Sequence, residues 1–406
     1  MKVLIYTEYF LPISGGVQSI VMELARGLAG WFPGAPDKER IEVTVVTATR
    51  ERATIDEGLP FRLVRGVNLR ELFQLLRAAD VVHLAGPAML PLALGLALGK
   101  RVVVEHHGYH AICPNGLLVY GADSSRCPGH FMAGRYGKCV ECNSNEWGWW
   151  KSMRGLMLTF LRRQLCRHAA ANIGVSDHVT RRLEIRNTRT IYHGISDSGL
   201  APRNGSRAGD HPLEIGYVGR LVSEKGLPLL LAASRRLADA GFRFRLTFVG
   251  DGPDRTKLEE LARRLGLGAW TKFLGDLSGA ALEKAVQPLQ VVVMPSLWEE
   301  TAGLAAIEQM MRGGVVVAAD TGGLGEVVDG AGLKFAVGDS DALYSSLKRV
   351  LEAPSLAASL GSAARARAIE KFSLETMVIQ HAELYRELLG RRPGTKRNLE
   401  KAAISA

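Results

Sequence analysis

Residues 104–114 concentrate side chains that can bind metals or move protons. They include His106, His107, His110 and Cys113, in a chain that has ten histidines and five cysteines. Neutral imidazole and thiolate are common metal ligands, and imidazole also exchanges protons near neutral pH. The stretch therefore fits a metal site, a catalytic site, or two different sites that share one loop.

A pair of carboxylates stands at the expected start of a helix near Gly303. Glu300 and Glu308 are eight residues apart, which would leave them about 80° apart on one continuous helix. We therefore expect Glu300 in the preceding loop or first turn and Glu308 on the helix. The free backbone N–H groups near Gly303 and Leu304 would face an anion. Taken alone, the pair equally fits ordinary charge complementation of the helix dipole.

Four of the five cysteines fall within one segment, residues 111–150, which is rich in Gly, Asn and Trp. Their spacing is C-x13-C-x11-C-x2-C, with the cysteines at Cys113, Cys127, Cys139 and Cys142. This spacing predicts a structural Zn²⁺ site, with His130 as a substitute ligand. A loop with little core of its own would take folding energy from the metal. Four free thiols or one oxidised pair fit the same spacing.

Short β-branched runs that alternate with helical patterns must position these groups. Strands are expected at 2–7, 42–48, 62–64, 81–86, 101–107, 171–176 and 188–194, and again at 213–219, 245–250, 271–275, 291–295, 315–320 and 333–337. Helices are expected between most of them, including 69–78, 88–98 and 152–168. Such alternation predicts parallel sheets covered on both faces, with ligands at the carboxyl ends of the strands.

The pattern restarts once, which predicts two doubly wound domains with a cleft between them. The first covers 1–196 and includes the cysteine-bearing insertion at about 111–150. A linker at 197–212 leads to the second domain, 213–372. A helix at 373–390 is expected to pack back toward the first domain, and 391–406 to be a flexible tail. The cleft is the expected active site.

The net charge of +10 is placed mostly in the N-terminal half. Up to Ser196 the chain has 24 Lys and Arg against 16 Asp and Glu, whereas the rest has 27 against 25. This asymmetry fits an anionic acceptor or a membrane surface. Nucleic acid is disfavoured because no zinc-finger spacing, RNP motif or aromatic-interleaved basic stripe is present. We expect a cytoplasmic protein, since the N-terminus looks like a buried strand rather than a signal peptide.

The helix expected at 152–168 is both basic and apolar. Trp147, Trp149 and Trp150 precede it, and its positive side chains are Lys151, Arg154, Arg162, Arg163 and Arg167. A core helix with a solvated basic face explains the pattern. Peripheral contact with an anionic membrane is the alternative interpretation.

Residues 295–328 resemble the donor-site signature of the family 4 retaining glycosyltransferases, which have the GT-B fold of two Rossmann-like domains. The matching positions are Pro295, Ser296, Glu300, Gly303, Leu304, Glu308, Gly314, Gly322, Gly323 and Glu326. Two departures occur: Thr301-Ala302 replaces the usual Gly-Phe, and Val315 replaces the usual Pro. The first departure leaves the identity of the donor sugar open.

The resemblance extends over nearly the whole chain. The matching turns contain Gly15 and Gly16 before the first helix, Gly219, Arg220 and Lys225 in 217–226, and Gly250 and Gly252 in 248–253. The segment with His83 also matches. In the subset with an H-x-Y-x-x-x-C-P motif, His107, Tyr109, Cys113 and Pro114 align, whereas His106 and His110 fall outside the match.

The resemblance implies retaining transfer of a sugar from a nucleoside diphosphate sugar, with UDP favoured over GDP. Arg220 and Lys225 would bind the diphosphate, because cations stabilise the charge that develops on the leaving group. Glu308 would bind the ribose, Glu300 the sugar hydroxyls, and His107 the transferred sugar. The N-terminal domain would bind the acceptor, a glycan or lipid-linked acceptor.

No cofactor is expected for catalysis, and no metal at the diphosphate. Asp339-Ser340-Asp341 is a D-x-D sequence, but it stands before a helix, where Asp and Ser are ordinary caps. The missing G-x-G-x-x-G after the first strand disfavours a nicotinamide enzyme. Three alternatives remain: a GT-B epimerase or phosphorylase, a non-catalytic partner subunit suggested by Thr301-Ala302, and a metal-dependent hydrolase built on the His/Cys loop.

Overall fold

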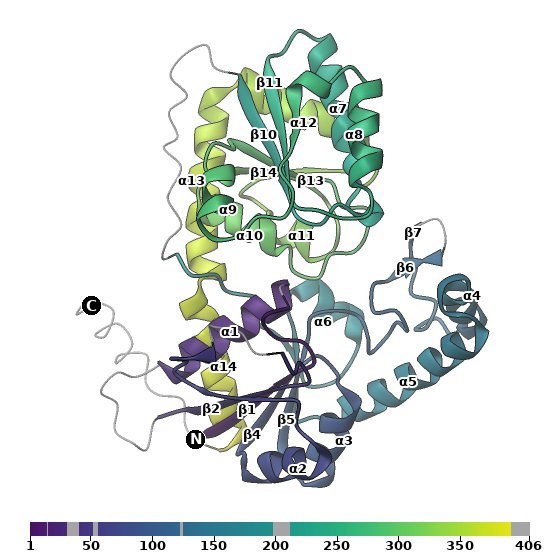
Figure 1. Ribbon diagram of the computed structural model, residues 1–406, viewed down its shortest axis with the longest axis vertical. Coiled ribbons are helices and arrows are strands. Elements are labelled where there is room, and N and C mark those ends of the chain that lie inside the picture. Colours follow the sequence, from purple (N-terminus) through teal and green to yellow (C-terminus); the bar gives the residue numbers. More distant parts are fainter. Residues whose placement is uncertain (14, 31–39, 52–55, 122–124, 198–211, 391–406) are drawn as a thin grey trace.

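The computed structural model describes residues 1–406 except 14, 31–39, 52–55, 122–124, 198–211 and 391–406. Two parallel sheets, each with helices on both faces, lie one above the other (Figure 1). The expected tail and all but the two ends of the expected linker fall outside the described residues.

The N-terminal sheet has seven parallel strands in the order β3-β2-β1-β4-β5-β8-β9. Their bounds are β1 Lys2–Thr7, β2 Glu42–Thr47, β3 Arg62–Arg65, β4 Val81–Ala85, β5 Arg101–His106, β8 Ala171–Gly174 and β9 Thr188–Thr190. Apolar residues run almost continuously through the central strands, as expected where helices cover both faces. The strand order reverses between β1 and β4, which opens a crevice at their carboxyl ends.

Two separate cores flank this sheet. One face packs against α2 (Leu69–Ala78), α3 (Met89–Ala97), α5 (Trp149–Arg167) and α6 (Asp177–Leu183). The other face packs against α1 (Gly16–Ala29) and α14 (Leu374–Leu388), the last helix of the chain. The expected helices at 69–78, 88–98 and 152–168 are confirmed within a few residues.

The C-terminal sheet has six parallel strands in the order β12-β11-β10-β13-β14-β15, with its own reversal between β10 and β13. The strands are β10 Leu213–Val218, β11 Phe244–Val249, β12 Thr271–Phe273, β13 Val291–Met294, β14 Val315–Ala319 and β15 Leu333–Phe335. The helices are α7 Leu227–Asp239, α8 Arg255–Arg264, α9 Gly279–Val286, α10 Leu304–Met311, α11 Gly322–Val327, α12 Ser340–Glu352 and α13 Pro354–Phe372. Asp339 caps α12 by accepting from the N–H groups of Asp341 and Ala342, as expected.

The cysteine-bearing insertion forms a short hairpin and one extra helix beside the N-terminal sheet. The hairpin pairs β6 (Val119–Tyr120) with β7 (Ser125–Arg126), and α4 (Tyr136–Trp147) follows and packs on α5. Its apolar side chains, including Phe131 and Val140, join the core of the N-terminal domain. The insertion therefore has more core than its composition predicts.

The chain crosses between the domains twice, at one place. Ile195 and Ser373 form a parallel bridge, in which the Ile195 N–H donates to Phe372 and the Leu374 N–H donates back to Ile195. After the second crossing α14 returns to the N-terminal domain and packs on α1 (Figure 1). Its Met377, Val378 and Tyr385 are buried in the core there.

Candidate active site

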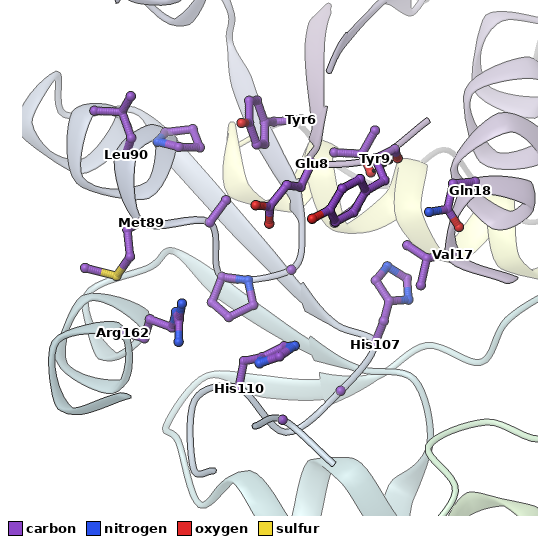
Figure 2. Close-up of a pocket in the computed structure, with 18 of the residues that line it drawn as sticks. Tyr6, Glu8, Tyr9, Val17, Gln18, Met89, Leu90, His107, His110 and Arg162 are labelled. Atoms are coloured by element: carbon purple, nitrogen blue, oxygen red, sulfur yellow. Dashed lines mark hydrogen bonds between the residues drawn. The ribbon is translucent and has the colours of Figure 1, made fainter. Parts of the chain in front are cut away.

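A cavity of about 540 Å³ opens at the carboxyl ends of β1, β4 and β5, on the side that faces the C-terminal domain. Residues 6–9 and 85–91 form most of its wall, and Trp298 contributes from the C-terminal domain. Figure 2 shows His107 and His110 on one side of it, and Tyr6, Glu8 and Tyr9 on another. The cavity therefore occupies the strand-order reversal, where ligands of such sheets bind.

The three histidines of residues 104–114 have three different surroundings. His107 lines the cavity, and its Nδ1 lies 3.0 Å from His193 Nε2. His110 is exposed on the cavity wall beside Arg162, although it falls outside the motif match. His106 is fully buried, and its Nε2 lies 2.9 Å from the Asn172 side-chain oxygen. The stretch is thus not a metal cluster formed by its own histidines.

The pKa values of both strand-end histidines are lowered. Burial lowers the pKa of His107, although the nearby Glu105 carboxylate opposes this shift. Burial lowers the pKa of His106 to about 4, opposed by its hydrogen bond to Asn172. His107 is consequently neutral near pH 7. Its Nδ1 contacts His193 and its Nε2 lies 3.5 Å from Glu105, so the imidazole lines the cavity without adding charge to it.

Lys225 and Glu300 form an ion pair in the C-terminal domain. Lys225 Nζ donates to Glu300 Oε1 over 2.6 Å, and the Ser296 hydroxyl donates to the same oxygen. The ammonium also lies 5.4 Å from the centre of the Trp298 ring, which lines the cavity. Burial raises the pKa of Glu300, but Lys225 and the two hydrogen bonds outweigh it and hold the pKa below its usual value. Glu300 is therefore ionised at neutral pH.

Arg220 follows β10 and projects toward solvent from the same edge of the sheet. Its side chain is 70 % exposed, and its nearest acidic neighbour, Glu224, lies 3.9 Å away. The Tyr217 hydroxyl donates to the backbone oxygen of Arg220 and holds the turn in place. Arg220 and Lys225 thus supply two cations within one turn of chain at the carboxyl end of β10.

The predicted donor-binding glycines are positions of close backbone approach. A Cβ atom at Gly250 would lie 2.0 Å from the Gly219 oxygen, and φ there is 126°, which L side chains rarely adopt. A Cβ atom at Gly252 would lie 2.3 Å from the Leu221 oxygen. The loops after β10 and β11 can therefore pack directly on each other only when these residues are glycines.

The loop with Gly15 and Gly16 meets the start of α10 across the domain boundary. Gly303 precedes α10 with a φ of 68° and exposes the first N–H groups of the helix. A Cβ atom at Gly16 would lie 2.8 Å from Leu304 Cδ1, so the first loop of the chain abuts the start of α10. Gly15 immediately precedes it. The structure thus brings these four predicted residues together.

Glu308 lies on α10, one helical turn before Arg312. Burial raises the pKa of Glu308, and the Arg312 guanidinium opposes this shift while Glu283 adds to it. Arg312 donates to the backbone oxygen of Glu308 over 3.0 Å and also pairs with Glu283. The Glu308 carboxylate therefore stands beside a cation that is already engaged elsewhere.

Glu299 joins the two domains, a role that the motif does not reveal. Its carboxylate accepts from Arg126 over 3.1 Å, Arg182 over 2.9 Å and, at the same distance, His178 Nε2, all in the N-terminal domain. Burial raises its pKa, but these partners outweigh burial and bring the pKa of Glu299 to about 2. The positive excess of the N-terminal half was the signal that such a partner was needed.

Four further hydrogen bonds close the same interface. The Glu326 carboxylate accepts from the backbone N–H groups of Asp177 and His178, each over 3.0 Å, and so caps α6 from the other domain. The Thr301 hydroxyl donates to the backbone oxygen of His107 over 3.1 Å, and Ser176 donates to the Thr301 oxygen over 2.6 Å. The residue that departs from the motif thus contacts the histidine expected to bind the sugar.

The four clustered cysteines are neighbours but do not converge. Cys113, Cys127 and Cys139 are buried, and the Gly121 N–H donates to Cys142 Sγ over 3.1 Å. Burial raises the pKa of Cys139 to about 12, and the other three sulfur atoms add to the shift. In the described part of the chain, no three cysteine sulfurs lie within 4.8 Å of one another.

Comparisons with known families agree with this geometry. The family described as "Glycosyltransferase Family 4" matches residues 14–198, and "Glycosyl transferases group 1" matches residues 203–367. The chain carries both glycosyltransferase domains. Their boundary falls between β9 and β10 in the sequence.

Curated relatives of these glycosyltransferase domains include two enzymes. The 2-deoxystreptamine glucosyltransferase of Streptomyces kanamyceticus is 38 % identical over 142 residues, which cover 34 % of this chain and 36 % of the relative. The glycogen synthase of Mycobacterium tuberculosis is 33 % identical over 197 residues, covering 48 % of this chain and 47 % of the relative. These matches span between about a third and a half of the relatives' length.

Solved structures establish the GT-B fold of the two glycosyltransferase domains. Sucrose-phosphate synthase from Thermosynechococcus elongatus superposes with a TM-score of 0.71 at 21 % identity, over 96 % of this chain and 99 % of that one. Anabaena HepE in complex with UDP has the same TM-score at 18 % identity, over 95 % and 100 %.

Proposed function

We propose that the protein is a retaining glycosyltransferase that moves a sugar from a UDP-sugar to an acceptor hydroxyl. The observation that carries the proposal is the placement of Arg220, Lys225 and Glu300 at one sheet edge, with the Trp298 ring joining Lys225 to the cavity that His107 lines. Two cations, one carboxylate and one neutral imidazole are the groups that a diphosphate and a sugar require.

The leaving diphosphate would lie against Arg220 and Lys225. Departure of the diphosphate concentrates negative charge on its oxygens, and fixed cations stabilise that charge more in a cleft than in water. The first N–H groups of α10, left free after Gly303, point to the same kind of anion. Support for UDP comes from HepE, which was solved in complex with UDP and with UDP-glucose.

Glu300 would orient the sugar through its hydroxyl groups. It is held ionised by Lys225 and Ser296, so it accepts hydrogen bonds without needing to change its protonation state. His107 would contact the same sugar from the opposite domain. Holding the sugar from both sides fixes the anomeric carbon relative to the acceptor and excludes water.

The acceptor would enter through the N-terminal domain. Arg162 lines the cavity, and a second hollow of about 350 Å³ beside it is lined by Trp147, Lys151 and Arg154 as well as Arg162. Positive and aromatic side chains along one path favour an anionic glycan or a lipid-linked acceptor. The exposed apolar residues of α5 favour the lipid-linked form.

A nucleotide screen tests the donor side directly. UDP, GDP, ADP and their common sugars are titrated by calorimetry against the full-length protein. We expect saturable binding of UDP and of one UDP-sugar, weakened at least tenfold in Lys225→Ala. Release of UDP only when acceptor is present supports transfer. Conversion of the donor alone would indicate an epimerase, and binding without any turnover would indicate a non-catalytic subunit.

Peripheral membrane contact is part of the proposal. No helix in the described chain combines the length and apolarity needed to cross a bilayer. On α5, Trp149, Trp150 and Met157 are exposed next to Lys151 and Arg154. Arg163, counted above with the basic face, is instead buried, and its guanidinium donates to the backbone oxygens at the end of α6.

Flotation with vesicles of anionic phospholipid tests this contact. We expect binding at low salt that weakens as salt screens the charges, and a loss of binding in the double variant Trp149→Ala/Trp150→Ala. A matched control is Leu274→Ala, an exposed apolar residue of the other domain. Equal flotation of the double variant and the wild type would show that α5 is not the contact.

We also propose that Cys113, Cys127, Cys139 and Cys142 hold a structural Zn²⁺. Three of them are buried together, and backbone N–H groups already point at the sulfur atoms of Cys113 and Cys142. Binding requires the four sulfurs to move inward. Zinc per chain is measured in the wild-type protein and in Cys139→Ser/Cys142→Ser. A difference of less than one zinc per ten chains between the two would refute this site.

A further inference from the structure

A cluster of ionisable side chains lies in the core between the N-terminal sheet and α14, outside the proposed donor site. Glu105 on β5 is 1 % exposed, and His83 on β4 and His381 on α14 are completely buried. His83 Nε2 lies 3.0 Å from Glu105 Oε2, and His381 Nε2 lies 3.9 Å from Glu105 Oε1. One nitrogen from each ring and one carboxylate oxygen all fall within 4.8 Å of one another.

The second nitrogen of each imidazole is held by the protein. The Tyr385 hydroxyl lies 2.9 Å from His83 Nδ1, and His381 Nδ1 lies 2.8 Å from the backbone oxygen of Met377. Because a carbonyl oxygen only accepts, the neutral His381 ring carries its proton on Nδ1. Its Nε2 therefore presents a lone pair to Glu105. Such anchoring of the remote ring nitrogen is typical of histidines that bind metals.

Two acceptors then face each other in the buried core. His381 Nε2 and Glu105 Oε1 have no hydrogen-bond partner among the residues that the structure describes. Leaving a carboxylate charge and a ring nitrogen unpaired in this way is costly. A cation between them would remove both deficits at once.

We propose that His83, Glu105 and His381 bind a divalent first-row transition metal, for which Zn²⁺ is the simplest occupant. Imidazole and carboxylate ligands suit such ions, whereas Mg²⁺ and Ca²⁺ prefer oxygen alone. Ligands of a tetrahedral Zn²⁺ stand about 3.4 Å apart, between the two separations of 3.0 and 3.9 Å observed here. Binding through Nε2 would require the neutral His83 ring to carry its proton on Nδ1, where the Tyr385 oxygen can accept it.

A neighbouring group around the same carboxylate is less suitable. His107 Nε2 lies 3.5 Å from Glu105 Oε2 and His193 Nε2 lies 3.9 Å from Glu105 Oε1. However, His107 Nδ1 and His193 Nε2 are hydrogen-bonded to each other over 3.0 Å, which occupies the nitrogen that His193 would offer.

A metal bound by His83, Glu105 and His381 would tie α14 to β4 and β5. It would also place positive charge behind His107.

Metal content measured on tag-free protein tests this site. The protein is unfolded with a denaturant in the presence of EDTA, refolded with ZnCl2 and desalted. Zinc per chain is then measured by mass spectrometry. All variants in this experiment carry Cys139→Ser/Cys142→Ser, so that thiolate-bound zinc does not contribute. The protein with only these two substitutions is called the parent here. We expect about one zinc in the parent and in His106→Gln, a buried histidine outside the cluster, and a loss of that zinc in His381→Gln. Equal zinc in His381→Gln and the parent would overturn the proposal.

A second measurement does not depend on whether any variant folds. Wild-type crystals grown with ZnCl2 are measured on both sides of the zinc absorption edge. An anomalous peak within bonding distance of His83 Nε2, Glu105 and His381 Nε2 is expected, and no peak there would refute the site. The result is independent of the proposed transferase activity, because the readout is the position of bound zinc and not turnover.

Discussion

Lys225 and Glu300 lie within hydrogen-bonding distance of each other, so each sets the charge environment of the other. Lys225 is held over the Trp298 ring, and its charge keeps Glu300 ionised. A diphosphate would share the ammonium with Glu300, so the site changes its partners without a protein group having to become charged. The barrier to binding is therefore mainly the exchange of one ion pair for another.

Replacing Lys225 with alanine removes the cation that pairs with Glu300 and that would also pair with a bound diphosphate. We expect turnover to fall about 10²- to 10³-fold, as when a charge-stabilising donor is removed from an active site. Initial rates with a UDP-sugar measure this effect. Arg245→Ala is the matched control, because Arg245 is an exposed arginine-type cation of the same domain that pairs with Glu214. A Lys225→Ala enzyme with near-wild-type rates would contradict the assignment.

Glu308 is expected to act on the nucleotide rather than on the reacting carbon. Its loss in Glu308→Ala should raise the KM for the donor at least tenfold, because an interaction with the ribose is present in both ground and transition state. Donor titrations at saturating acceptor separate KM from kcat. A variant with reduced kcat and unchanged KM would place Glu308 at the reacting centre instead.

At the scale of elements, the start of α10 depends on one backbone conformation. Gly303 has a φ of 68°, and a Cβ atom there would lie 3.1 Å from Leu324 Cδ1. The helix N-terminus can face the proposed donor site only while this turn is kept.

Gly303→Ala should therefore lower both stability and donor affinity. Backbone strain at positive φ costs about 1–2 kcal/mol in the free energy of unfolding. If the turn changes conformation, the first N–H groups of α10 would no longer face the anion. Gly330→Ala provides the control, since Gly330 has a φ of 71° but nothing within 4 Å of the new Cβ atom. Chemical unfolding should show a similar decrease in the free energy of unfolding for both variants. UDP calorimetry should show a loss of UDP affinity only in Gly303→Ala.

The elements were largely predictable from the sequence, whereas their side-chain partners were not. Alternating apolar runs locate β1, β4 and β5 because central strands of parallel sheets are buried on both faces. The pairing of Glu299 with Arg182 joins residues 117 positions apart, and no local periodicity encodes it. His83 and His381 are almost 300 positions apart, so their convergence on Glu105 required the fold. His110 lies outside the motif match, yet the turn after β5 places it on the cavity wall.

At the scale of the molecule, the interface between the domains rests on buried charge. Glu299 holds three N-terminal side chains, and Glu326 caps α6 from the opposite domain. Glu299 lies in the loop after β13 and Glu326 lies on α11, both within residues 295–328. Contact between the domains and the proposed donor site therefore depend on the same short segments.

Acid should weaken this interface. The pKa of Glu299 is about 2 in the folded protein, below its ordinary value of about 4.3 when unfolded. Its stabilising contribution is thus complete above the unfolded pKa and is lost as pH falls toward 2. We expect Glu299→Gln to lower the melting temperature at pH 6, with a difference from wild type that shrinks below pH 4.

The control for this comparison is Glu214→Gln. Glu214 pairs with an exposed arginine on the surface of one domain, so the variant should differ little from wild type at either pH. A Glu299→Gln variant that melts like wild type at pH 6 would show that the three partners contribute nothing to stability.

The return of α14 to the N-terminal domain also constrains the order in which a nascent chain can fold. The residues that complete one face of the first sheet, Met377, Val378 and Tyr385, are the last described part of the chain to leave the ribosome. Chains grow at about 5–20 residues per second, so that face, which α1 covers only in part, stays incomplete for many seconds while the second domain is made. We therefore expect the domain that is synthesised first to be the one that finishes folding last.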